Sequence, residues 1–317
     1  MPGLDDDYYS NLLAWSARNQ IAMCLDNKIY IYDCRTGAAT KVHEAFSCEA
    51  VASLAFDPLG ERIAFGNVLG QVTIWDLARQ QELAILEHHD QRVACLDWTA
   101  GGLLSGSKDR RVALSDPRAP RAPASVFRGH NQEVCGVKWS CDGGLFASGG
   151  NDNIALVWDP RGVAPFTTIR HQAGVKALAW SPHSPGVLAT GGGSTDRMIR
   201  TWNVRHNLKL DERDTGSQVC GMLFSHLTND IVSIQGYPHN EVAVWRADGL
   251  RKVGGLRGHA ARPLYLCMSP DAKTMVSASS DETMRFWKLF GTPSLTCKAR
   301  KPKPPKDSRG NPSTDLC

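Results

Sequence analysis

Two sets of residues combine a histidine, a serine, an aspartate and a tryptophan at the same spacing. The steps within each set are 18, 4 and 6 residues, and the sets are His130, Ser148, Asp152 and Trp158, and His259, Ser277, Asp281 and Trp287. A serine, a histidine and a carboxylate could perform nucleophilic catalysis. A hydrogen-bond chain from indole through hydroxyl and imidazole to carboxylate could instead brace a strand against a turn. Recurrence of the whole set favours the structural brace, because a repeat accounts for every member.

The stretch 129–159 shows what such a brace would hold. Its runs VCGVKW, LFASGG and IALVW are short and β-prone, and turn-forming residues separate them. His130 precedes the first run, Ser148 lies on the second and Trp158 ends the third. A sheet of this size cannot bury its own faces, so the unit must stack on copies of itself.

Seven such units follow one another. They close at 32–33, 75–76, 115–116, 158–159, 202–203, 245–246 and 287–288, with separations of 43, 40, 43, 44, 43 and 42 residues. Leu69 replaces the turn aspartate in the second unit, and Ser115 replaces the tryptophan in the third. The period predicts an all-β fold, a seven-bladed β-propeller of the WD40 type.

The ends of the repeat set the expected domain boundaries. We expect a lead-in at 1–9, the propeller at 10–290 and a disordered, Pro- and Lys-rich tail at 291–317. The first unit begins late and the last stops early. Residues 10–16 are therefore predicted to add a strand to the last blade and to close the ring through main-chain hydrogen bonds.

Composition narrows the class of protein. The tail holds six Lys or Arg against two Asp, which accounts for the net charge of +4 and leaves a neutral body, so nucleic-acid binding is not expected. No apolar run reaches the about 18 residues of a membrane helix, and the acidic start lacks a secretory pattern, so we expect an intracellular, non-membrane protein. The ten cysteines lack C-x-x-C spacing and are interpreted as reduced core thiols.

No motif for chemistry stands out from the repeat. GGGSTDR at 191–197 is an inserted stretch that lacks the Lys-Ser/Thr ending of a phosphate-binding loop. No zinc spacing or isolated nucleophile motif is present, so neither a metal nor a cofactor is expected, and a binding protein is favoured over an enzyme. A propeller hydrolase would need a solvent-open cluster of titratable groups outside the brace.

Several segments in order closely resemble one family. NLLAWS, GHNQEVCGVKWS, ASGGNDN, VLATGGGSTDRMIRTWN, DTGSQVCGMLFS and SDETMRFW are similar to segments of the Fizzy and Fizzy-related co-activators of the anaphase-promoting complex, over residues 4–290. The resemblance implies a substrate adaptor, which binds short degrons of cell-cycle proteins and presents them to a ubiquitin ligase.

The resemblance also implies two degron sites. The residues that correspond to the Lys-Glu-Asn degron site are Asn151, Asn153, Ser194, Gln218 and Arg262. Amides and a hydroxyl could bind the degron's Asn and backbone, and Arg262 could pair with its Glu. Asn151 and Asn153 could instead merely shape a tight turn.

The destruction-box groove would lie between the first and last blades, with Leu13 in its apolar pocket and Glu282 facing the degron's Arg. Family members usually show an Asp where this chain has Ala14, which would weaken that contact.

The partners implied are ligase subunits, degron-bearing proteins such as cyclins or securin-like proteins, and spindle-checkpoint proteins, in nucleus and cytoplasm. The basic run KARKPKPPK at 298–306 is either a nuclear-import signal or a solvated tail. The family's C-box and its Ile-Arg ending are not found in this sequence. Their absence leaves two alternatives: a truncated version of a longer protein, and a divergent member that binds degrons without activating the ligase. The rival from another functional class is a general WD-repeat scaffold that holds a multiprotein complex together.

Overall fold

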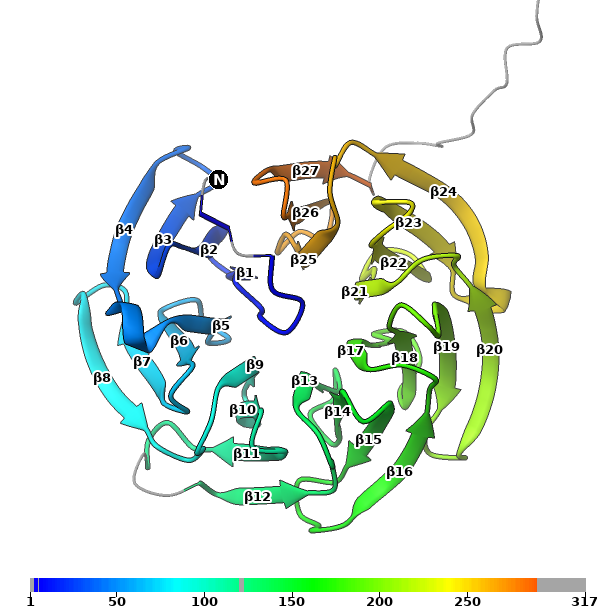
Figure 1. Cartoon of the computed structure of the whole chain (residues 1–317), viewed down its shortest axis with the longest axis horizontal. Helices are drawn as coiled ribbons and strands as arrows, with labels where there is room; N and C mark the ends of the chain where they lie inside the picture. Colours follow the sequence, from blue (N-terminus) through cyan, green and yellow to red (C-terminus); the bar gives the residue numbers. More distant parts are fainter. Residues whose placement is uncertain (1–2, 5, 120–122, 290–317) are drawn as a thin grey trace, which may run out of the picture.

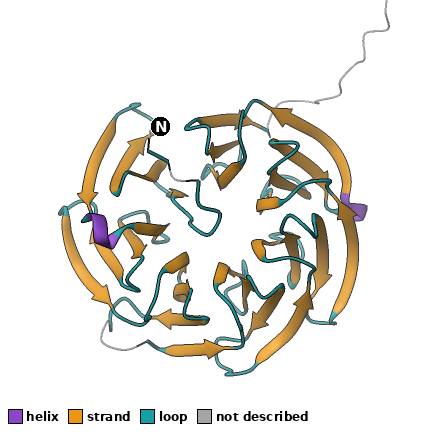
Figure 2. Cartoon of the chain, in the orientation of Figure 1, coloured by secondary structure: helices purple, strands orange, loops and turns teal. Residues whose placement is uncertain are grey.

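The computed structural model describes residues 3–4, 6–119 and 123–289. Seven small antiparallel sheets stand around a central channel like blades (Figure 1), so the predicted seven-bladed β-propeller is confirmed. Six sheets have four strands, and the last has three within the described residues. Loops gather on the two rims of the disc and around the channel (Figure 2). Among the described residues, no helix has the length and apolarity needed to cross a membrane.

The strands follow the chain from the channel outward in each blade. Blade 1 has β1 (Leu13–Trp15), β2 (Gln20–Leu25), β3 (Lys28–Asp33) and β4 (Ala39–Glu44). Blade 2 has β5 (Val51–Phe56), β6 (Arg62–Asn67), β7 (Val72–Asp76) and β8 (Gln81–Leu86), and blade 3 has β9 (Val93–Thr99), β10 (Gly102–Ser107), β11 (Arg111–Ser115) and β12 (Ser125–Arg128). Blade 4 has β13 (Val134–Trp139), β14 (Phe146–Gly150), β15 (Ile154–Trp158) and β16 (Pro165–Arg170).

Blades 5 to 7 continue this order. Blade 5 has β17 (Val175–Trp180), β18 (Val187–Gly192), β19 (Met198–Asn203) and β20 (Leu208–Asp214). Blade 6 has β21 (Val219–Phe224), β22 (Asp230–Gln235), β23 (Glu241–Arg246) and β24 (Arg251–Arg257), and blade 7 has β25 (Pro263–Met268), β26 (Thr274–Ser279) and β27 (Met284–Lys288). Two single-turn 3-10 helices, η1 (Ser47–Glu49) and η2 (Asp248–Leu250), lie in connections.

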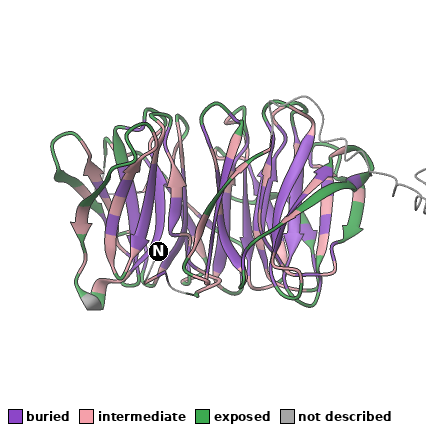
Figure 3. Cartoon of the chain, turned by 90° about the horizontal axis from the view of Figure 1, so that it is seen from above, coloured by how far each residue is buried: buried purple, intermediate pink, exposed green. Residues whose placement is uncertain are grey.

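The core lies between the blades. Buried residues follow the strands, and exposed residues lie mainly on the rims and the outermost strands (Figure 3). Neighbouring blades approach so closely that some inner positions admit only glycine. A Cβ on Gly136 would lie 2.3 Å from the Lys176 carbonyl oxygen, and one on Gly149 would lie 2.3 Å from that of Val175. Because such contacts are impossible for a side chain, both glycines are needed where blades 4 and 5 pack.

The predicted closure by residues 10–16 is wrong. β1 pairs with β2 of its own blade, with Leu13 opposite Met23 and Trp15 opposite Ile21. A tight turn joins the two strands, so this local pairing forms at little loop-closure cost. The ring closes between blades 1 and 7 by side-chain packing instead, and the cluster there includes Leu13, Ile21, Leu264, Tyr265 and Val276.

The hydrogen-bonded braces occur in four blades. In blade 4, His130 Nε2 and Trp158 Nε1 each lie 2.8 Å from Ser148 Oγ, and His130 Nδ1 lies 3.1 Å from Asp152. Blade 7 repeats this with 2.7 Å between His259 Nε2 and Ser277 Oγ, 2.8 Å from Trp287 to that oxygen, and 3.2 Å from His259 Nδ1 to Asp281. Blades 3 and 5 use His89 and His171, which the sequence search missed.

The carboxylates of the braces are held in their charged form. Burial alone would raise the pKa of Asp281, but hydrogen bonds from Thr283 and the Ala260 amide outweigh it and lower this pKa to about 2. Burial lowers the pKa of His259, so its imidazole stays neutral at physiological pH. A neutral imidazole can donate to the carboxylate while accepting from the serine. These groups are therefore engaged in holding turns.

Removing the central hydroxyl should destabilise the fold. Ser148 is fully buried and serves both an imidazole and an indole. Ser148→Ala leaves the indole N–H unsatisfied, so we expect the free energy of unfolding to fall by about 1–3 kcal/mol in urea titrations. Ser184→Ala, at an exposed position, is the matched control and should change it by less than about 0.5 kcal/mol. Equal stability of the two variants would show that the brace is dispensable.

Candidate peptide-binding surface

Five residues expected at one degron site lie in loops of a single rim. Asn151 and Asn153 lie in the turn between β14 and β15, and Ser194 lies between β18 and β19. Gln218 and Arg262 directly precede the innermost strands β21 and β25. Because the four strands of a blade alternate in direction, all these loops leave the rim where the innermost strands begin, here called the entry rim.

The five side chains differ in how available they are. Asn153 and Ser194 are exposed, whereas Asn151, Gln218 and Arg262 are half-buried. Asn153 has a φ of 66°, in the left-handed region that asparagine tolerates better than most residues. Turn geometry alone can therefore explain Asn153, and its role in binding a peptide stays a prediction.

The N-terminal segment 6–10 crosses the mouth of the channel on the entry rim (Figure 1), an arrangement that sequence reasoning did not anticipate. The Asp6 carboxylate accepts a hydrogen bond from Arg262 Nε at 3.0 Å and lies 2.9 Å from Nη2, which donates to the Asp6 main-chain carbonyl at 3.2 Å. The Tyr9 hydroxyl donates to Asn151 Oδ1 at 3.2 Å. Asn151 and Arg262, two of the five residues expected to bind a peptide, thus already have hydrogen-bond partners from the chain itself.

Cations from several blades hold this segment. Arg92 donates to Asp7 at 2.8 Å and to Glu133 at 2.8 Å, and its guanidinium lies 5.6 Å from the centre of the Tyr9 ring. Lys176 donates to the Ser10 carbonyl at 2.8 Å. The sequence does show an acidic and aromatic run ahead of the first strand. Its basic partners lie 85 or more residues away, so these contacts could not be predicted from the sequence.

Lys176 lies in the channel beneath the segment. Its ammonium lies 5.2 Å from the centre of the Tyr8 ring and 5.0 Å from that of Tyr265, so both aromatic faces stabilise the cation. Burial lowers the pKa of Lys176 to about 8. Burial raises the pKa of Cys220 to about 11 and that of Cys135 to about 12, so these thiols stay protonated. The channel wall here suits neither a thiolate nucleophile nor a soft metal.

The inserted stretch at 191–197 shapes the rim. Asp196 lies 2.7 Å from His171 Nδ1 and 2.7 Å from Arg200 Nη1, and it is buried. The Thr195 hydroxyl donates to the Gln172 carbonyl at 3.1 Å. These contacts fix the chain directly after Ser194, whose side chain stays exposed.

The two residues expected in the destruction-box groove lie in different environments. Leu13 is 3% exposed and belongs to the core between blades 1 and 7. Glu282 lies in the turn between β26 and β27, where its carboxylate accepts the Gly3 amide at 3.2 Å. Their roles in binding stay predictions.

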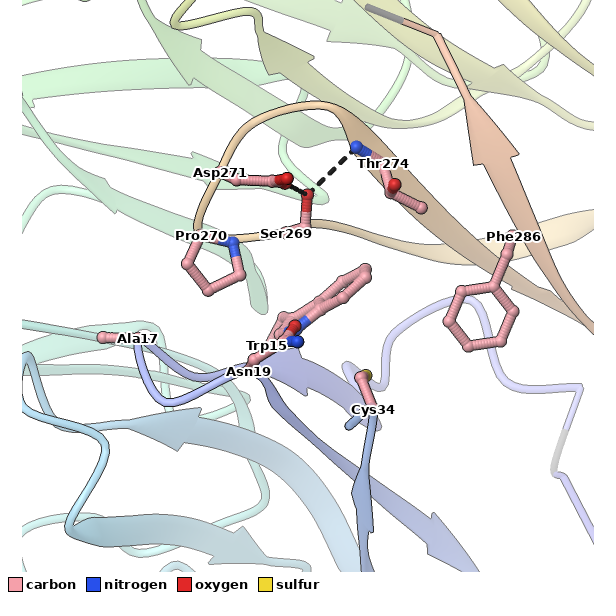
Figure 4. Close-up of a pocket in the computed structure, with 9 residues that line it drawn as sticks. All are labelled: Trp15, Ala17, Asn19, Cys34, Ser269, Pro270, Asp271, Thr274 and Phe286. Atoms are coloured by element: carbon pink, nitrogen blue, oxygen red, sulfur yellow. Dashed lines mark hydrogen bonds between the residues drawn. The ribbon is translucent and has the colours of Figure 1, made fainter. Parts of the chain in front are cut away.

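An open cleft does lie between blades 1 and 7, towards the opposite rim. It has a volume of about 410 Å³, and Trp15, Cys34, Pro270 and Phe286 line it (Figure 4). The indole of Trp15 and the ring of Phe286 contact edge to face, with centroids 6.2 Å apart. Sequence reasoning missed these aromatic residues because both belong to the repeat pattern and look like core.

The titration of Lys176 is a direct check on the channel. We expect its ammonium to lose a proton near pH 8, because burial destabilises the charged form. Proteins labelled with ¹³C-lysine, titrated by NMR, should show one resonance with this midpoint, and Lys176→Arg should remove it. A midpoint near the ordinary value of about 10.4 would show that the mouth is open to water.

Comparison with known proteins assigns the family. A family model described as the CDC20/Fizzy WD40 domain matches residues 1–287. The chain is 42% identical to "Protein FIZZY-RELATED 1" of Arabidopsis thaliana over 293 residues, which cover 92% of this chain and 62% of that protein. It is 40% identical to "APC/C activator protein CDH1" of Saccharomyces cerevisiae over 293 residues, which cover 92% of this chain and 51% of that protein.

A solved structure agrees with these relatives. A chain of the "Crystal Structure of Mitotic Checkpoint Complex" superposes with a TM-score of 0.89 at 36% identity, over 92% of this chain and 90% of that one. The present chain spans between about half and two thirds of the length of these two curated relatives. Sequence identity, the family model and the shape of the ring agree, and the chain belongs to the CDC20/Fizzy family of WD40 propellers.

Proposed function

We propose that this propeller is the substrate-binding part of an adaptor that recruits degron-bearing cell-cycle proteins to the anaphase-promoting complex, so that they are ubiquitinated and degraded. One observation carries the proposal. Amides, a hydroxyl and a guanidinium from blades 4 to 7 all lie in loops of the entry rim. Such a set of convergent donors and acceptors suits a short extended peptide.

The chemistry of each group matches a Lys-Glu-Asn peptide. Arg262 offers the planar fork of donors that a glutamate carboxylate accepts, and its side chain is 29% exposed. Asn153, Ser194 and Gln218 can donate to and accept from an asparagine amide and the peptide backbone. The proposed role is one of binding, with no catalytic step in the propeller. Ligase subunits, cyclin- or securin-like substrates and spindle-checkpoint proteins are its proposed partners.

A destruction box is proposed to bind more weakly. Glu282 supplies one carboxylate for its Arg, and Ala14 stands where the family usually has a second. The Trp15–Phe286 cleft offers an apolar surface between the same two blades. Location in nucleus and cytoplasm is part of the proposal, with the basic run at 298–306 as its support.

Peptide titrations test the main proposal. A Lys-Glu-Asn peptide should bind with micromolar affinity, and Arg262→Ala or Asn153→Ala should each weaken binding by about 1–3 kcal/mol. For a Lys-Gln-Asn peptide, Arg262→Ala should weaken binding much less, because the glutamine side chain carries no charge for Arg262 to pair with. Arg161→Ala is the matched control, since Arg161 pairs with Asp159 in a turn of the opposite rim.

These titrations also separate the alternatives. If neither peptide binds the intact protein at millimolar concentration, the degron proposal fails and a general scaffold is favoured. Binding without stimulation of ubiquitination in a reconstituted ligase would instead identify a divergent member that holds degrons without activating the ligase.

Asp6 should compete with the peptide. It occupies the Nε and Nη2 donors of Arg262, and these are the donors that a peptide carboxylate would use side-on. Asp6→Asn should therefore tighten Lys-Glu-Asn binding several-fold in calorimetry, and Arg262→Ala should abolish that gain. Weaker binding by Asp6→Asn would show that Asp6 orients the guanidinium for the peptide.

A further inference from the structure

Gly3 is seated between the first and last blades on the entry rim. Its amide donates to the Glu282 carboxylate at 3.2 Å, and its carbonyl accepts the Asp26 amide at 3.1 Å. Glu282 belongs to the turn between β26 and β27, and Asp26 to the turn between β2 and β3. Gly3 has a φ of 85°, and a Cβ there would lie 2.4 Å from the Asp26 carboxylate. The seat therefore suits glycine and disfavours any larger residue.

Leu4 anchors the same stretch of chain. Its side chain is 6% exposed and belongs to the apolar core that contains Leu12 and Leu13. Leu13 is the residue expected to line the pocket of the destruction-box groove. Burial of the Leu4 side chain favours the seated state, because it removes apolar surface from water. The chain thus contributes a leucine of its own to the core from which that groove is expected to open.

The residues that follow contact the other proposed degron site. The Asp6 carboxylate lies against Arg262, and the Tyr9 hydroxyl donates to Asn151. The trace runs inward from the junction of blades 1 and 7 to the mouth of the channel (Figure 1). One continuous stretch of chain therefore contacts groups assigned to both degron sites.

A peptide can displace these contacts one after another. The side chains of Asp6 and Arg262 are 59% and 29% exposed, so water screens their ion pair and a peptide carboxylate can replace Asp6. Each contact that remains must then hold the stretch against its conformational entropy with fewer partners. Release at one end therefore makes release at the other end easier.

We infer that this stretch, Gly3–Leu4 with Asp6–Tyr9, is a single intramolecular occupant of both degron sites and couples them. The inference rests on the proposed function and concerns the regulation of the same sites. A peptide that displaces Asp6 from Arg262 loosens Gly3 at Glu282, so a second peptide has less to displace there. Because coupling between two sites is reciprocal, each degron should raise the affinity for the other by the same factor.

Two unlinked peptides test the coupling. Calorimetry would measure the affinity of a Lys-Glu-Asn peptide with and without a saturating destruction-box peptide, and the reverse. We expect each peptide to tighten binding of the other about fivefold or more. Avidity cannot contribute, because the peptides are not joined. Gly3→Ala, which disfavours the seat, should tighten binding of both peptides and bring the coupling factor close to one.

Hydrogen exchange tests the stretch without any peptide. The Asp26 amide reports on the seat, because its acceptor is the Gly3 carbonyl. Arg262→Ala should raise the exchange rate of this amide several-fold, and Tyr9→Phe, which removes only a hydroxyl, should raise it to a smaller extent. Arg161→Ala, on the opposite rim, is the matched control and should leave the rate unchanged.

The outcomes separate this inference from the proposed function. If both peptides bind with a coupling factor of one or less, or if exchange of the Asp26 amide is the same in Arg262→Ala and Arg161→Ala, the two ends act independently. The inference then fails while the degron proposal stands. If neither peptide binds, the degron proposal fails, and the exchange rates alone decide whether the stretch is released as one unit.

Discussion

A blade of this protein is too thin to be stable alone, and the rest of the structure follows from that constraint. Each sheet must cover both of its faces with its neighbours, and the ring lets each blade do so. Hydrogen bonds reinforce the contact, because Trp139 donates to the Gly102 carbonyl at 3.2 Å and Trp180 to the Lys138 carbonyl at 3.0 Å. Each indole belongs to one blade and each carbonyl to the one before it. The positions of the rim loops are thus set by packing between the blades, to which the loops themselves contribute little.

Much of the architecture could be predicted from the spacing of a few residues. Trp158, Trp202, Trp245 and Trp287 recur at a nearly constant step, and the blades they close are those observed. The histidines of the braces in blades 3 and 5 could not be recognised, because His89 and His171 lack the glycine that precedes His130 and His259. The hydrogen bonds of the brace require the imidazole, whereas the preceding glycine takes no part in them and serves only to identify the motif in a sequence.

The two ends of the ring were harder to assign. A repeat that starts late and stops early is consistent with a strand exchanged between its ends and with a strand kept in the first blade. The choice depends on loop closure: the turn after Trp15 returns the chain to β2 within a few residues, which local geometry favours. The periodicity of the sequence carries no information about this competition.

The peptide-binding surface shows a similar limit. Asn151, Ser194 and Arg262 could be named only because the segments that carry them resemble those of the Fizzy family. The contacts of Asp6 and Tyr9 could not, since the partners lie 256 and 142 residues away. Only the closed ring brings them together.

The path of residues 6–10 across the channel has a practical consequence. Residues 6–10 run over the surface that is proposed to bind substrates, with Asp7 and Ser10 held by cations of blades 3 and 5. A fluorescent reporter or purification handle attached directly ahead of residue 6 would stand over that surface and screen it from a macromolecular ligand. Attachment in an outward-facing hairpin of the opposite rim would leave the mouth clear.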